Sequence, residues 1–111
     1  NINSFGEFFF HIIGKYEKVY AQAMDAFREE RSHFVKALES VSYLRVLPSE
    51  ANYVLCEVKE RFTPRELAVR LLREYGILIK DCSQKCKGNY IRLAVRDTED
   101  NNQLLKALRE L

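Results

Sequence analysis

One arginine in this sequence stands on a segment that would hold it rigidly. Residues 89–96 read NYIRLAVR, in which every second side chain from Ile91 onward is apolar. Such alternation predicts a half-buried β-strand with Arg92 on the face opposite the apolar side chains. A guanidinium fixed in this way suits a planar anion such as a carboxylate, because it can donate two parallel hydrogen bonds. The alternative is a surface arginine paired with Glu57 or another acid.

The three cysteines, Cys56, Cys82 and Cys86, are the residues to consider for disulfides or a metal site. An odd number does not indicate a disulfide framework, and free thiols fit a reducing compartment, so we expect a cytoplasmic protein. Cys82 and Cys86 are four residues apart, but no second ligand pair follows at a zinc-binding spacing. We therefore expect no metal site, and the apolar neighbours of Cys56 favour a place in the core.

Composition and missing motifs narrow the possible functions. Eighteen basic and sixteen acidic side chains give a formal charge of +2, which is too balanced to indicate nucleic-acid binding. No apolar run approaches the ~20 residues of a membrane-spanning helix, so no membrane partner is expected. The sequence has neither a glycine-rich phosphate loop nor a Gly-x-Ser-x-Gly motif. The chain thus offers binding groups but no complete reaction centre.

The remaining patterns describe the elements that must position Arg92. Apolar spacings of three and four predict a long helix over about residues 5–40. A coiled coil is one interpretation of this seam, but a helix at a domain edge that packs on two partners is favoured. Capping residues Thr63 and Asp97 begin two further helices, and Gly76 ends the first of them. Strands are predicted over residues 44–47, 52–58, 77–80 and 89–96, with a polar turn over 83–89.

This order of elements predicts an α+β fold. We expect a small, mainly antiparallel sheet of three to four strands, with helices packed on one face and a long N-terminal helix. A chain of this length favours a single domain over residues 1–111, composed of the helix and a sheet subdomain over about 43–111. Arg92 would then lie on the uncovered face of the sheet, where a ligand can reach it.

Three segments together resemble the C-terminal small domain of fold-type I, pyridoxal-phosphate-dependent aminotransferases. PSEANYVL (48–55) is similar to the Ala-Asn-aromatic strand of that family, and YGILIK (75–80) is similar to its Gly-Ile-x-Val-Arg strand. YIRLAV (90–95) is similar to its Leu-Arg-Ile-Thr-Val strand. The branch of histidinol-phosphate aminotransferase and threonine-phosphate decarboxylase is the most similar. Within it, the chain resembles members in which a nucleotidyltransferase domain precedes the aminotransferase.

The resemblance implies roles for four residues. Arg92 matches the arginine that binds the substrate α-carboxylate. Lys80 matches a basic residue that contacts the distal group in the phosphate-handling branch, although arginine is usual there. Asn52 and Tyr53 match the Ala-Asn-aromatic strand and are expected near the cleft.

The resemblance also implies a cofactor and partners. The parent enzyme would be an aminotransferase that binds an amino acid, and pyridoxal 5'-phosphate (PLP) would be held by a large domain of the same protein. The parent would be a homodimer, whereas this fragment alone would bind no cofactor and be inactive. Because the chain begins with Asn1 and its only methionine is Met24, we expect it to be part of a longer protein.

Two other functions fit the same patterns. One is a non-catalytic α+β regulatory or ligand-binding module that captures an amino acid or another protein through the open sheet face. The other is a helical oligomerisation unit that self-associates through residues 13–38. A PLP-binding domain encoded before residue 1 would favour the enzyme over both.

Overall fold

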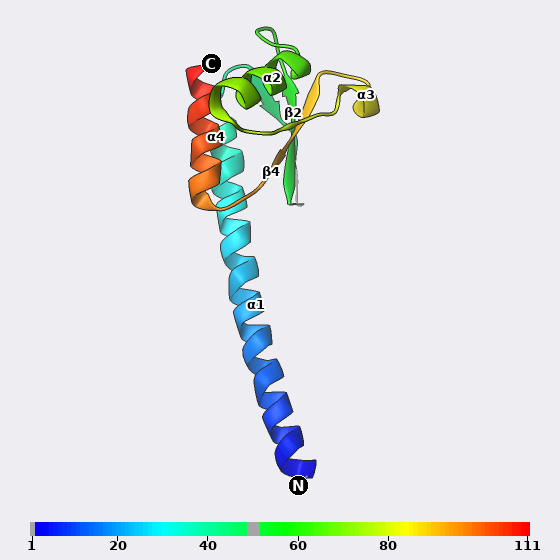
Figure 1. Cartoon of the computed structure of the whole chain (residues 1–111), viewed down its shortest axis with the longest axis vertical. Coiled ribbons are helices and arrows are strands. Elements are labelled where there is room, and N and C mark those ends of the chain that lie inside the picture. Colours follow the sequence, from blue (N-terminus) through cyan, green and yellow to red (C-terminus); the bar gives the residue numbers. More distant parts are fainter. Residues whose placement is uncertain (1, 49–51) are drawn as a thin grey trace. The chain divides into compact units, whose positions relative to one another are not determined.

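The computed structural model describes residues 2–48 and 52–111. They form, in order, helix α1 (Ile2–Leu38), strands β1 (Leu44–Val46) and β2 (Tyr53–Val58), helix α2 (Pro64–Tyr75), strand β3 (Lys80–Asp81), helix α3 (Ser83–Cys86), strand β4 (Tyr90–Ala94) and helix α4 (Thr98–Glu110) (Figure 1). The α+β class and the long N-terminal helix are confirmed. The chain divides into two compact units, Asn1–Glu30 and Arg31–Leu111. The expectation of a single domain stays a prediction.

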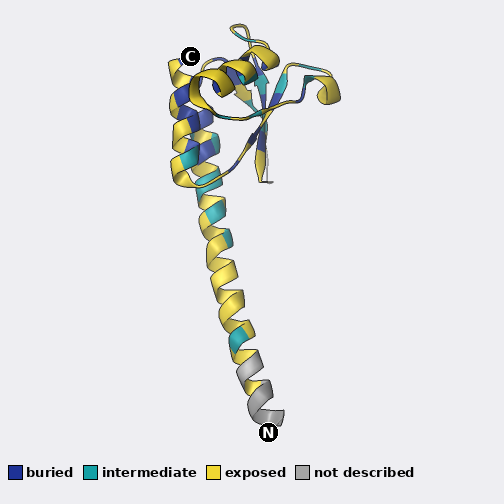
Figure 2. Ribbon diagram, viewed as in Figure 1, coloured by how far each residue is buried: buried dark blue, intermediate teal, exposed yellow. Residues whose placement is uncertain are grey.

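The first unit is helical and exposes apolar side chains. Phe10 and Tyr16 are each 73% exposed, and Tyr20 is 68% exposed; Figure 2 shows exposed residues along most of this part of α1. An amphipathic helix normally covers its apolar stripe with a neighbour. Whether this helix packs on two partners, forms a coiled coil or mediates oligomerisation stays a prediction.

The second unit is built on an antiparallel sheet in the strand order β1-β2-β4-β3. Its two longest strands, β2 and β4, pair at the centre, with Leu55 opposite Arg92 and Cys56 opposite Ile91. Since side chains alternate across a strand, this register puts Cys56 and Ile91 on one face and Leu55 and Arg92 on the other. The predicted antiparallel sheet is confirmed, with four strands among the described residues.

One face of the sheet carries the core. Val54, Cys56, Ile91 and Leu93 are each fully buried. The helical residues buried with them are Phe34 and Leu38 from the end of α1, Leu67 and Leu71 from α2, and Leu104, Leu105 and Leu108 from α4. Burial of each such side chain is worth about 1.5–3 kcal/mol relative to exposure. The helices therefore cover one face of the sheet and leave the Arg92 face open, as predicted.

Caps fix where the two covering helices begin and end. The Thr63 hydroxyl accepts a hydrogen bond from the Glu66 amide, and the Glu66 carboxylate accepts one from the Thr63 amide, which completes a capping box. Gly76 ends α2 with φ +67°, a left-handed conformation that glycine adopts without strain. Asp97 caps α4 through the amide of Asp100. All three predicted caps are confirmed.

Two predicted segments differ from the structure. Of the strand expected over residues 77–80, only Lys80 is in β3, and β3 continues through Asp81. The polar turn expected over 83–89 contains the short helix α3. The Ile77 amide donates back to the Leu71 carbonyl at the end of α2, so this residue completes the helix cap instead of joining the sheet.

Candidate functional site

The register of the strands arranges the open face of the sheet in rows. Residues directly opposite one another on antiparallel strands share a face and lie within contact distance. Along the strands, the rows are Arg45 with Glu57 and Tyr90 (the Arg45 row), Leu55 with Arg92 and Lys80 (the Arg92 row), and Tyr53 with Ala94 (the Tyr53 row). The cation predicted to bind an anion thus lies at the middle of the face.

Arg92 is exposed on β4, between two strands that offer it no acid in its own row. Its direct neighbours are Leu55 on β2 and Lys80 on β3. Glu57, the partner considered from the sequence, bonds Arg45 instead, at 2.9 Å. Within residues 2–48 and 52–111, no carboxylate forms an ion pair with Arg92. The interpretation of Arg92 as half of a surface salt bridge with Glu57 is therefore wrong.

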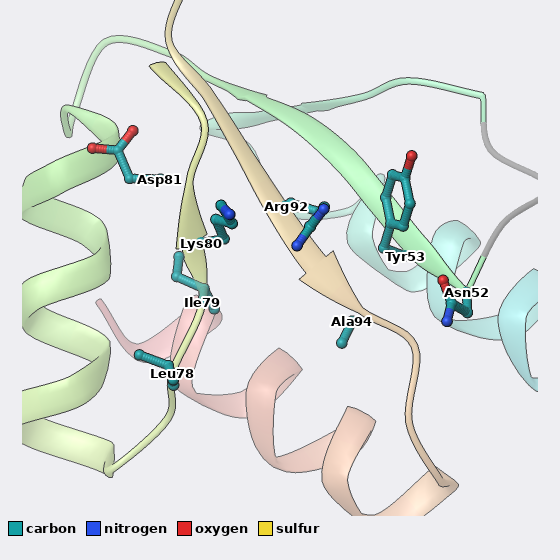
Figure 3. A pocket seen from close by; sticks show the side chains of 8 residues that line it. All are labelled: Asn52, Tyr53, Leu78, Ile79, Lys80, Asp81, Arg92 and Ala94. Atoms are coloured by element: carbon teal, nitrogen blue, oxygen red, sulfur yellow. The ribbon is translucent and has the colours of Figure 1, made fainter. Parts of the chain in front are cut away.

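Tyr53 lies beside Arg92 from the neighbouring row. The Cζ atom of Arg92 is 5.1 Å from the centre of the Tyr53 ring, within the range of a cation–π contact. Figure 3 shows Arg92 between Tyr53 of β2 and Lys80 of β3. The arginine thus has an aromatic ring on one side and a second cation on the other.

The four residues expected at the site line one open cavity. Its volume is about 720 Å³, and its lining includes Asn52, Tyr53, Lys80 and Arg92 (Figure 3). Sequence segments separated by up to 40 positions are brought together because β2 and β3 pair with opposite edges of β4. The structure thus assembles the predicted residues in one place, while their roles stay predictions.

The same cavity has lining residues that sequence analysis did not select. Leu78 is 81% exposed at its edge, and Ile79, Asp81 and Ala94 complete the wall. Asp81 accepts a hydrogen bond from the Ser83 amide at 2.9 Å, so its carboxylate supports the start of α3. An Asp two residues before a serine in a polar segment is a known turn signal, and it could have identified this contact.

A second missed residue, Asn101, holds the chain where β4 ends. Its side chain accepts from the Arg96 amide at 2.9 Å and donates to the Arg96 carbonyl at 3.0 Å. Asn101 is 2% exposed, which makes it the buried polar side chain of the described core. A buried amide that satisfies both polar groups of one residue fixes the backbone after the Arg92 strand. No sequence motif announces such a contact.

Among the described residues, Asp81 is the one acid that lines this cavity, and no cysteine lines it. Burial raises the pKa of the Cys56 thiol to about 12, and its place in the core is confirmed. Cys82 is buried and Cys86 is exposed, and both are free. In the described part of the chain, no three histidines, cysteines or acids lie close enough to hold a metal ion. Among the same residues, no helix combines the length and apolarity needed to cross a bilayer.

The arrangement has a clear electrostatic consequence. Like charges directly opposite on neighbouring strands destabilise a sheet, and Lys80 faces Arg92 in this way. Such a local conflict is typical of a binding site, because an anion bound between the two cations removes it. The face is therefore suited to a ligand that carries one or two negative groups.

A comparison with known protein families identifies the family of this chain. The family model described as "Aminotransferase class I and II" matches residues 12–108, which include all four strands and the cavity. The chain belongs to the aminotransferase class I and II family. Membership does not by itself fix the reaction or the substrate, because the family model describes a fold shared by many enzymes.

Similarity to individual proteins agrees with this assignment. Histidinol-phosphate aminotransferase 2 of Archaeoglobus fulgidus is 36% identical over 93 residues, which are 83% of this chain and 26% of that protein. CMP-5'-(3-aminopropyl)phosphonate synthase of Streptomyces rubellomurinus is 28% identical over 114 residues, 100% of this chain and 18% of that protein. A solved decarboxylase from Sulfurospirillum multivorans has a TM-score of 0.80 and 33% identity, over 84% of this chain and 27% of that one. The chain thus spans between about one sixth and just over one quarter of these relatives.

Proposed function

We propose that this chain is the substrate-binding small domain of a PLP-dependent aminotransferase, and that Arg92 binds the α-carboxylate of the amino-acid substrate. The observation that carries the proposal is the Arg92 row: an exposed guanidinium in mid-sheet whose direct neighbours are Leu55 and Lys80. A charge-assisted, bidentate hydrogen-bonded pair with a carboxylate contributes about 1.5–3 kcal/mol. That energy is enough to select and orient an amino acid.

Lys80 would receive a second anionic group of the substrate. It faces Arg92 directly across β3 and β4 and lines the same cavity. A lysine ammonium binds a phosphate or carboxylate as a point charge, without the bidentate geometry of arginine. Asn52 lines the cavity beyond the Tyr53 row and would contribute its amide to the substrate. The expected substrate is therefore an amino acid with an acidic distal group.

The cofactor PLP would be held by another part of the parent protein. The cavity on this chain has cations suited to substrate anions, whereas we assign none of its residues to the cofactor. When bound, PLP supplies the electron sink for the chemistry at the α-carbon. This chain would supply orientation: Arg92 holds the carboxylate and so determines which bond at the α-carbon is aligned for cleavage.

Transamination is the proposed reaction, and decarboxylation is a second candidate. The family match and the similarity to a histidinol-phosphate aminotransferase favour transamination. The solved decarboxylase with a TM-score of 0.80 favours decarboxylation. Both reactions need the α-carboxylate to be held, but they differ in which bond is broken. Assays for released carbon dioxide and for oxo-acid product distinguish the two directly.

The parent protein would also contain a further domain and would pair with a second copy of itself. The 114 matched residues are only 18% of the phosphonate synthase, whereas 93 residues are 26% of the aminotransferase, so the synthase is the longer protein. Its name refers to a CMP-bearing product, which supports a nucleotidyltransferase domain in a parent of the same kind. We further propose a homodimeric parent in the cytoplasm, where the three thiols would stay reduced.

The experiment that tests this function is Arg92→Lys in the full-length parent. Lysine keeps the positive charge but loses the planar, bidentate geometry, so we expect the KM for the amino acid to rise at least about tenfold. Steady-state kinetics with the preferred amino donor measure the effect. Unchanged kinetics would contradict the assignment of Arg92.

Lys80→Met provides the matched comparison at the same cavity. Methionine keeps the length and apolar stem of lysine and removes its charge. We expect the KM to rise for amino acids with an anionic distal group and to stay within about twofold for neutral amino acids. Equal effects on both substrate classes would exclude Lys80 as the distal-group ligand while leaving the role of Arg92 intact.

A further inference from the structure

We propose that Tyr53 is a positioning residue for Arg92: its ring holds the guanidinium in the orientation that grips the substrate carboxylate. This inference rests on the proposed function of Arg92 and adds a residue to it. The observation behind it is the 5.1 Å separation between the Cζ atom of Arg92 and the centre of the Tyr53 ring.

The sheet register explains why these two side chains meet. Tyr53 is directly opposite Ala94, and Arg92 is two residues from Ala94 on the same face of β4. A diagonal neighbour of this kind lies within reach of an aromatic ring and a long side chain. Ala94 has only a methyl group, so it leaves the space between Tyr53 and Arg92 open. The small residue in the Tyr53 row therefore permits the contact.

Electrostatics favour the same orientation. Lys80 repels Arg92 from the β3 side, and Leu55 on β2 offers no charge. The negative face of an aromatic ring attracts a guanidinium without occupying the N–H groups along its edge. Tyr53 can thus restrain the flexible side chain of Arg92 while the N–H groups of the guanidinium stay directed at a ligand. An acid in the same place would restrain Arg92 equally well but would compete with the substrate.

Another cation–π cluster of the chain shows the difference. Arg70 lies 5.6 Å from the centre of the Phe62 ring, and its guanidinium also bonds the Glu74 carboxylate at 3.0 Å. That arginine is held by a ring and an acid together, as a structural residue of α2. Arg92 has the ring contact, while no ion pair joins it to an acid in the described residues. The comparison indicates that the ring contact of Arg92 leaves its guanidinium available to bind a ligand.

The proposal is tested by two substitutions at residue 53 in the full-length parent. Tyr53→Phe keeps the ring, whereas Tyr53→Val removes it and keeps a residue that favours strands. We expect Tyr53→Val to raise the amino-acid KM about two- to fivefold, the range of a cation–π contact at an exposed site, with kcat changed by less than about twofold. Tyr53→Phe should stay within about twofold of the wild type in both constants.

A double-mutant cycle separates this proposal from the function on which it rests. In an Arg92→Ala background, Tyr53→Val should change kcat/KM by less than about twofold, because the residue that Tyr53 positions is gone. If Arg92→Ala leaves kcat/KM unchanged, the proposed function fails and this inference fails with it. If Arg92→Ala lowers kcat/KM but Tyr53→Val has the same effect in both backgrounds, only the positioning role is overturned.

NMR spectroscopy of the unsubstituted protein tests the contact between Tyr53 and Arg92 without relying on a variant that must fold. The side-chain protons of Arg92 should resonate upfield of those of Arg96, because a ring current acts on the former. Arg96 is the matched control, since it follows β4 and pairs with Asp100 at 2.9 Å. An upfield shift of the Arg92 protons would support the stacking contact, and equal chemical shifts for the two arginines would overturn it.

Discussion

Two rows on the same sheet face differ in the residue that lies opposite an arginine. In the Arg45 row, Arg45 faces Glu57 directly across β1 and β2, and the two side chains bond at 2.9 Å. In the Arg92 row, Arg92 faces Leu55 on one side and Lys80 on the other. Both arginines are exposed on antiparallel strands, Arg45 on the edge strand β1 and Arg92 on the inner strand β4, and they differ in the residues placed opposite them. An acid in that position satisfies the first cation, and its absence leaves the second to a ligand.

The contrast shows how a site can be recognised on a structural scaffold. An exposed salt bridge such as Arg45–Glu57 contributes little stability, about 0–1 kcal/mol, and it does no chemistry. The Arg92 row is locally unfavourable, because Lys80 and Arg92 carry like charges. A conflict of this kind within an otherwise consistent sheet is where binding is expected. The register, more than the presence of an arginine, therefore distinguishes the two rows.

The largest effect that tests the comparison is a charge reversal in each row. Arg92→Glu in the parent would repel the substrate carboxylate as well as lose the bond, so kcat/KM should fall at least about a hundredfold. Arg45→Glu makes the same chemical change on the same face and should leave kcat/KM within about threefold. Steady-state kinetics of both variants measure the difference.

Folding provides the control for this pair of reversals. Arg45→Glu sets two acids opposite one another and should lower the free energy of unfolding by no more than about 1 kcal/mol. Arg92→Glu removes a like-charge contact with Lys80, so it should not destabilise the chain. Comparable losses of activity in the two variants would mean that the face acts through its overall charge, and the distinction between the rows would be lost.

A smaller effect is expected when the Arg92 row is converted into a copy of the Arg45 row. Leu55→Glu puts a carboxylate directly opposite Arg92, as Glu57 is opposite Arg45. The new acid would compete with the substrate for the guanidinium, so KM should rise about tenfold. Stability should change by less than about 1 kcal/mol, because a cross-strand ion pair replaces a half-buried leucine.

Leu55→Gln is the matched control for that conversion. Glutamine has the same size and polarity pattern as glutamate but no charge, so it should leave KM within about twofold to threefold. If the two variants raise KM equally, the loss of the leucine side chain is responsible and the added charge is not. In that case, competition between the new acid and the substrate for Arg92 would not explain the rise in KM.

Much of this fold is written in local sequence patterns. Alternation through residues 89–96 predicted which face of β4 is buried, and Thr63 and Asp97 predicted where two helices begin. These signals are local, since each depends on residues within one turn or one strand. The prediction of a strand over 77–80 was wrong because it used only the local apolar run. The Ile77 amide bonds back to the Leu71 carbonyl, and an apolar run alone does not show that the chain is still completing a helix.

The site was predicted only in part, because it depends on register. A resemblance to a family selected Asn52, Tyr53, Lys80 and Arg92, and the structure places them around one cavity. The pairing of Glu57 with Arg45, and the ring contact of Tyr53 with Arg92, follow from which residues face each other across strands. A single sequence does not specify that pairing. Asn101 was missed because its two bonds to Arg96 join a helix to a loop without a motif.

The smallest expected effect concerns the opposite face of the same strand. Cys56 follows Leu55 on β2 and is fully buried, and burial raises the pKa of its thiol from 9.0 to about 12. A thiol whose pKa is higher in the folded state stabilises the fold below its unfolded pKa, and this stability is lost as pH rises toward the folded pKa. Between pH 9 and pH 10 the free energy of unfolding should therefore fall by about 1 kcal/mol from this group alone.

Cys56→Ala isolates that contribution from the other titrating groups. Burial also raises the pKa of Tyr43, from 10.0 to about 12, so that hydroxyl contributes to the loss of stability mainly above pH 10. The alanine variant should be less stable than the wild type at pH 8, because a cavity replaces the thiol, and this difference should shrink by about 1 kcal/mol by pH 10. Urea unfolding of both chains under reducing conditions measures it. A constant difference across that range would mean that the Cys56 thiol has the same pKa in the folded and the unfolded chain, which would contradict its burial on the core face of β2.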